Sequence, residues 1–121
     1  MIIWNTTRNK DLPDELKEFE EAVLSGRIVM TTSVDALIHP VDVLTSLSDV
    51  LKRHVALDTL HLCDEDAETN RGAVEYGDRV MTVHKDVPLR GDKTIDTLWV
   101  ITDGGWKDGH RVTTFLLPED Y

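Results

Sequence analysis

The spacing of the apolar residues changes along the chain, and this change limits the fold more than any other feature. Up to residue 76 they recur every three or four positions, as in helices with one buried face. From residue 79 they alternate, as in half-buried strands. A chain of 121 residues suits one domain. We therefore expect a single α+β domain over residues 1–121, built in two layers.

Two helices with a clear apolar face are expected, one over residues 11–24 and one that begins near Pro40. Asp11 is the expected cap of the first, which ends before Gly26. Its apolar face consists of Leu12, Leu16, Phe19 and Val23. The apolar face of the second consists of Val41, Leu44, Leu47, Leu51 and Val55. A short helical turn over 33–38 is expected before it.

A third helix is expected from Asp64 to Tyr76, although its apolar stripe is thin. The acids of its first turn favour the positive end of the helix dipole, and Gly77 suits its end. With the two preceding helices, this gives about three helices to pack on the sheet.

Strands are expected over residues 79–87, 95–102 and 111–117, and a further strand over 27–32. The connections between the last three are short and rich in glycine, which predicts a three-stranded antiparallel meander. Both faces of the middle strand are apolar, so it should be central and covered by helices on at least one side. Ile95, Thr97, Trp99 and Ile101 should share one face, and Leu98, Val100 and Thr102 the other.

The formal charge of −10 argues against two classes of partner. Nucleic acid and anionic membranes both repel a chain this negative, and its 13 Lys and Arg residues are scattered rather than clustered. We therefore expect no direct binding to nucleic acid and no membrane association. No apolar run approaches the roughly 20 residues that a membrane-spanning helix needs.

The single cysteine, Cys63, has no partner for an internal disulfide, which indicates a reducing compartment. The first residues lack the basic and apolar regions of a signal peptide. Both observations predict a cytoplasmic protein.

His61 and Cys63 are the main candidates for chemistry, because on a strand both would point the same way. Two soft ligands fall short of a zinc site, so no metal is expected. Acids at positions 64–66 would raise the pKa of the thiol, which argues against a nucleophile. No glycine-rich phosphate loop is present, and no cofactor is expected. A small enzyme or metal protein that uses His61 and Cys63 remains an alternative.

Acids also line the outer face of the first helix. They are Asp11, Asp14 or Glu15, Glu18 and Glu21. Such a stripe either keeps the surface solvated or imitates a nucleic-acid backbone. Trp106 lies in polar surroundings, where a tryptophan either anchors a partner or folds back over the edge of the core. Glu15, Glu18, Glu21 and Trp106 are thus the predicted partner-binding residues.

Two C-terminal segments, Leu98–Asp103 and Thr113–Tyr121, carry a family resemblance. They resemble the ending of small uncharacterised bacterial proteins described as plasmid-related, and sometimes as a type I restriction modification subunit. The resemblance extends upstream through Thr31–Leu37, Arg53-His54, Asp66, Asn70 and Gly77–Val80. The chain departs from it at Leu60–Cys63, where relatives carry Trp-Gly, and at the inserted Gly104–Gly109.

The resemblance implies a bacterial mobile element and no established activity. The glycine-rich cofactor loop and Asn-Pro-Pro-Tyr motif of a methyltransferase are both missing from the sequence. Among the shared residues, Trp99 would fill the core, Asn70 would satisfy helix or loop backbone, and Pro118 would stop the last strand.

These observations favour a non-catalytic acidic accessory protein that acts by binding another protein. A more specific hypothesis is an inhibitor that imitates nucleic acid and blocks a host nuclease, restriction or CRISPR system. A third interpretation is a homodimer joined through a strand edge or the loop that carries Trp106.

Overall fold

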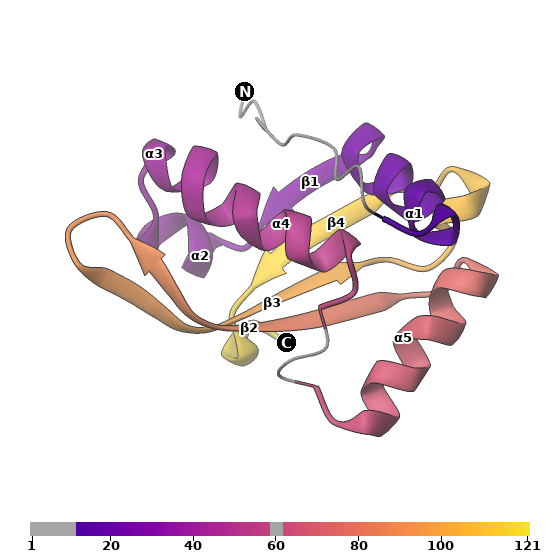
Figure 1. The fold of residues 1–121 in the computed structure, drawn as a ribbon. Coiled ribbons are helices and arrows are strands. Elements are labelled where there is room, and N and C mark those ends of the chain that lie inside the picture. Colours follow the sequence, from indigo (N-terminus) through magenta and orange to yellow (C-terminus); the bar gives the residue numbers. More distant parts are fainter. Residues whose placement is uncertain (1–11, 59–61) are drawn as a thin grey trace.

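A computed structural model describes residues 12–58 and 62–121 of the chain (Figure 1). The expected cap Asp11 and the candidate His61 lie outside the described residues. The helices and strands are α1 (Asp14–Ser25), β1 (Arg27–Met30), α2 (Thr32–Leu37), α3 (Pro40–Asp42), the π-helical turn η1 (Val43–Leu47), α4 (Ser48–Val55), α5 (Asp64–Tyr76), β2 (Val80–Leu89), β3 (Lys93–Thr102), the 3-10 turn η2 (Trp106–Asp108), β4 (Val112–Leu116) and the 3-10 turn η3 (Pro118–Asp120).

The strands form one sheet in the order β1-β4-β3-β2. β2, β3 and β4 are the predicted antiparallel meander, with β3 inside the sheet. The expected N-terminal strand is β1, which pairs in parallel with β4. The α+β fold is therefore confirmed, and the parallel pairing of β1 with the meander makes the four-stranded sheet a mixed one.

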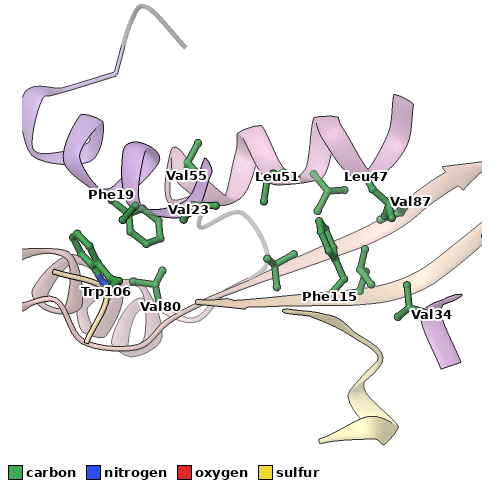
Figure 2. Packing of buried hydrophobic residues seen from close by; sticks show 14 of the residues in the cluster. Phe19, Val23, Val34, Leu47, Leu51, Val55, Val80, Val87, Trp106 and Phe115 are labelled. Atoms are coloured by element: carbon green, nitrogen blue, oxygen red, sulfur yellow. The ribbon is translucent and has the colours of Figure 1, made fainter. Parts of the chain in front are cut away.

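Helices α1 and α4 lie on one face of the sheet, and the core fills the space between these layers (Figures 1 and 2). The apolar residues that the sequence placed on the first helix, Phe19 and Val23, are fully buried there. They belong to one core together with Leu47 and Leu51 from the helical layer and Val80 and Phe115 from the sheet.

The turn η1 corrects the predicted apolar face of the second helix. Val41 and Leu44 are 47% and 50% exposed, whereas Leu47, Leu51 and Val55 are buried as expected. A π turn holds one residue more than an α turn, so Leu44 within it and Val41 before it are rotated away from the core. Ser48 stabilises the wide turn, because its Oγ donates a hydrogen bond of 2.7 Å to the Val43 carbonyl.

The alternation of β3 is also corrected. Leu98, Val100 and Thr102 face the helices, but Ile95 joins the same core instead of sharing a face with Trp99. The backbone of the neighbouring strand takes a left-handed conformation at Asp86, with φ of 51°, and the buried side of β2 shifts there from even to odd positions. Trp99 does not fill the core as expected: it is half-buried on the opposite face, 5.6 Å from the Tyr121 ring.

Helix α5 has the bounds that the sequence predicts and ends at Gly77, whose φ of 75° suits glycine. Asn70 joins this helix to the edge of the sheet. Its side-chain nitrogen donates to the Met81 carbonyl at 2.6 Å, and its oxygen accepts from the Met81 N–H at 3.1 Å. Asn70 thus satisfies strand backbone, not the helix or loop backbone that was expected.

Candidate functional site

The acids predicted to bind a partner project from α1. Glu15, Glu18 and Glu21 are all exposed, on the side of the helix away from Phe19 and Val23. The one base of this helix, Lys17, lies 3.3 Å from Asp14, and both side chains are solvent-exposed. Five acids against this one base leave the helix strongly acidic.

Helix α5 is a second strongly acidic helix, and the sequence alone did not reveal that it contacts α1. α1 and α5 contact each other at the same end of the molecule (Figure 1). Each holds five acids and one base, so together they carry −8 of the formal charge of −10. We name their exposed outer faces the acidic surface. The run of acids from Asp64 to Glu68 was a sequence signal for a second acidic helix. We interpreted that run only as favourable to the positive end of the helix dipole.

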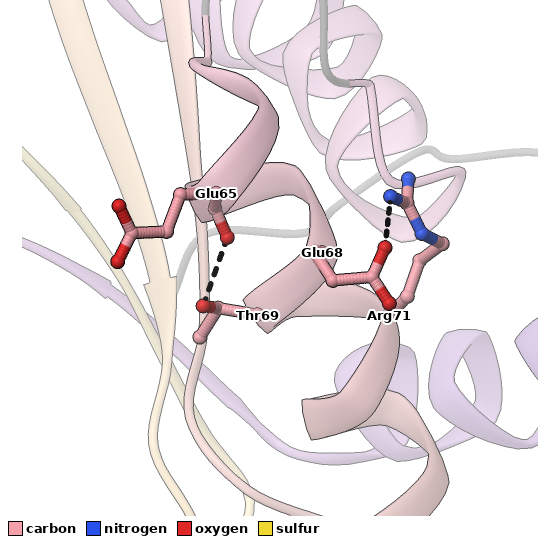
Figure 3. Close-up of polar contacts among 4 residues, drawn as sticks. All are labelled: Glu65, Glu68, Thr69 and Arg71. Atoms are coloured by element: carbon pink, nitrogen blue, oxygen red, sulfur yellow. Dashed lines mark hydrogen bonds and ion pairs between the residues drawn. The ribbon is translucent and has the colours of Figure 1, made fainter.

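Local contacts keep the acids of α5 at the surface (Figure 3). The only base of the helix, Arg71, pairs through Nη2 with Glu68 at 2.5 Å. Thr69 donates its hydroxyl to the Glu65 backbone carbonyl at 3.0 Å. The Glu65 carboxylate points away from Thr69 and from the pair of Glu68 with Arg71 (Figure 3).

Trp106 is not part of this surface, and the exposed position on which its prediction as a partner-binding residue rested is corrected. The side chain is only 1% exposed. Its ring packs edge-on against Phe19 with centroids 5.2 Å apart, and Nε1 donates to the Asp78 carbonyl at 3.0 Å. The turn η2, with left-handed glycines before and after it, folds the ring back over the edge of the core.

The candidates for chemistry are not assembled into a centre by the described residues. Cys63 is exposed and directly precedes α5. Within residues 12–58 and 62–121, no group of three or more His, Cys, Asp and Glu side chains is placed to hold a metal ion.

A buried polar chain crosses the core, and the sequence analysis missed it. His54 of α4 is fully buried, with Nδ1 2.7 Å from the Thr82 hydroxyl and Nε2 2.8 Å from the Thr102 hydroxyl. Thr82 continues to His84 and Thr102 to Thr113, each across 2.8 Å. Burial, with a smaller effect of His84, lowers the pKa of His54 to about 3, so the imidazole is neutral. The sequence signal for this chain was the presence of histidine and threonine at strand positions that the apolar alternation predicts to be buried.

One end of this chain reaches a cleft between the helical layer and β2. The cleft has a volume of about 320 Å³, and His84 lies in its wall. Val50 and Val87 provide an apolar floor, and Arg53 pairs with Asp49 at 3.1 Å on the helical side. Ser46 donates its hydroxyl to the Pro88 carbonyl and so ties the helical layer to the strand.

Comparison with protein-family models, curated proteins and solved structures found no match to this chain. Among the described residues, no helix is both long enough and apolar enough to cross a membrane.

Proposed function

We propose that this chain is a non-catalytic accessory protein that acts by binding a basic protein through its acidic surface. The supporting observation is the concentration of charge. Two helices in contact carry −8, which leaves only −2 for the rest of the chain. A cytoplasmic location in a bacterial mobile element, the setting that the family resemblance implies, is part of this proposal.

Charge of one sign on one end of a molecule acts at a distance. It accelerates the encounter with a basic partner, and salt weakens this effect because the Debye length falls to roughly 8 Å at physiological ionic strength. The affinity of the partner should therefore fall steeply as salt rises. Exposed acids can also be reversed without disturbing the core, which makes the proposal accessible to mutation.

Affinity capture from the native host at low salt tests the proposal. We expect a basic partner that elutes as salt rises and that is lost when Glu15, Glu18 and Glu21 are replaced together by Lys. A matched control replaces Asp35, Asp96 and Glu119 by Lys, which changes the net charge equally at exposed positions away from α1 and α5. Capture that survives reversal on α1, or that both triple variants lose equally, would contradict the proposal.

A second candidate function is inhibition of a nuclease or restriction enzyme by imitation of nucleic acid. The exposure of Asp14, Glu15, Glu18 and Glu21 on a regular helix favours it, because neighbours three or four residues apart lie about 5–6 Å from each other. Under this hypothesis, duplex DNA or RNA added to the captured complex should displace the protein. If a saturating amount of either nucleic acid leaves the complex intact, the acidic surface does not occupy the nucleic-acid-binding site of the partner, and this hypothesis is wrong.

A further inference from the structure

We infer that the cleft between α4 and β2 binds an extended peptide segment with basic residues, which adds to the sheet as a short strand alongside Lys85. This binding site lies away from the acidic surface and depends on different residues. It can therefore be tested separately from the proposed function.

At the free edge of β2, the side-chain amide of Asn70 forms the two backbone hydrogen bonds that a neighbouring strand would form. β2 is an outer strand of the sheet, with only β3 beside it. Because the Asn70 amide bonds to both the N–H and the carbonyl of Met81, these backbone groups point away from β3. The amide occupies the place that a peptide group of an added strand would take.

The same backbone pattern recurs two residues further along. In an antiparallel strand, outward-pointing and inward-pointing residues alternate, so Val83 and Lys85 also direct their N–H and carbonyl groups outward. Lys85 lines the cleft. Beyond it, the left-handed backbone of Asp86 and the missing N–H of Pro88 interrupt the edge. These limits restrict an added strand to a short stretch and disfavour edge-to-edge aggregation.

The walls of the cleft suit one apolar side chain. Val50 and Val87 form a floor for the apolar group, and a volume of about 320 Å³ accommodates it together with part of its backbone. Among the lining residues, Arg53 and Lys85 balance the charges of Asp49 and Asp86, and the Lys85 ammonium donates to Thr97 on β3 at 2.8 Å. The preference for a basic segment comes from the whole chain, whose formal charge is −10.

Selection from a phage-displayed library of random linear heptapeptides tests this inference with the full-length protein. We expect enriched sequences with an apolar residue flanked by Lys or Arg. Binding is then compared in Lys85→Pro and Lys85→Ala. Proline removes the outward N–H while the ladder with β3 stays intact, and alanine keeps that N–H while removing the same charged side chain. Circular dichroism and thermal unfolding confirm that both variants are folded.

The expected result is a loss of at least tenfold in affinity for Lys85→Pro and little change for Lys85→Ala. N-methylation of alternate residues in a selected peptide should weaken binding to the same extent, because it removes the complementary backbone donors. Selection that enriches no sequence over a bare support overturns the inference. So do selected peptides that bind Lys85→Pro as tightly as the unmodified protein.

Discussion

His54 is held neutral by its surroundings, and this has consequences for its hydrogen bonds. A neutral imidazole has one donor and one acceptor nitrogen, and each of its two threonine partners has a single proton. The chain from His84 to Thr113 can therefore be ordered in two directions, each with its own His54 tautomer. In either order, every bond between these five side chains has one donor and one acceptor, and the described residues contain no buried side-chain nitrogen or oxygen without a partner.

The lowered pKa of His54 predicts a loss of stability in acid. In the unfolded chain His54 takes up a proton near pH 6.5, whereas in the folded protein it does so only near pH 3. The contribution of His54 to the free energy of unfolding is therefore fully present above pH 6.5. It falls by about 1.4 kcal/mol per pH unit as the pH drops toward 3. Denaturant unfolding at pH 6, 5 and 4 should show a steeper decline for the unmodified protein than for His54→Gln. Parallel declines would show that His54 is not the titrating group.

Trp106 provides a second test at the level of one side chain. Replacement by Ala should lower the free energy of unfolding by about 3–5 kcal/mol, because it empties a buried site against Phe19. Trp106→Phe should cost less, since one ring remains, although the second ring and the bond from Nε1 to Asp78 are lost. The Phe variant should also capture a partner normally. Loss of capture by this folded variant would return Trp106 to the binding surface.

The elements depend on tertiary contacts to different degrees. α1 keeps the apolar face that its sequence shows, because its spacing is regular from Leu16 to Val23. The second helix does not, since η1 changes the rotation of the residues before it. α5 has a thin apolar stripe and relies on a polar link, the amide of Asn70, to hold it beside β2.

Removal of this link should therefore destabilise both α5 and the sheet edge. Asn70→Ala leaves the outward N–H and carbonyl of Met81 without their partner, at a cost of about 1–3 kcal/mol. Hydrogen exchange at the Met81 amide should become faster in the same variant. Thr69→Ala is the matched control, because this exposed neighbour bonds only within its own helix. Similar stability for the two variants would contradict the role given to Asn70.

The whole molecule has an uneven distribution of charge. The acidic surface sits at one end, and repulsion between α1 and α5 opposes the packing that brings them together. The described basic groups near this surface, Lys17, Arg71 and Lys107, pair mainly within their own helix or with backbone. The folded state thus accepts electrostatic strain that a partner or salt would relieve.

Moderate salt should consequently stabilise the isolated protein. Screening on the order of 1 kcal/mol would raise Tm by about 4 °C for a domain of this size. Thermal unfolding in sodium chloride from low concentration to the physiological range measures this effect. The triple variant with Gln at Glu15, Glu18 and Glu21 should melt higher at low salt and respond less to added salt. An identical response would place the repulsion elsewhere in the molecule.

The amino-acid sequence was sufficient for the α+β class, the meander and the bounds of α5, because these depend on apolar spacing and on local signals such as Gly77. It was also sufficient for the exposure of Glu15, Glu18 and Glu21, since the opposite face of their helix is apolar. Local spacing carries this information without reference to the rest of the chain.

Only the tertiary structure decided the rest. The burial of Trp106 and the contact between the two acidic helices arise from residues far apart in sequence. The polar chain around His54 likewise joins α4 to three strands. Periodicity along a segment specifies which face is buried, but it does not specify what that face meets, because partners are chosen by packing across the whole molecule.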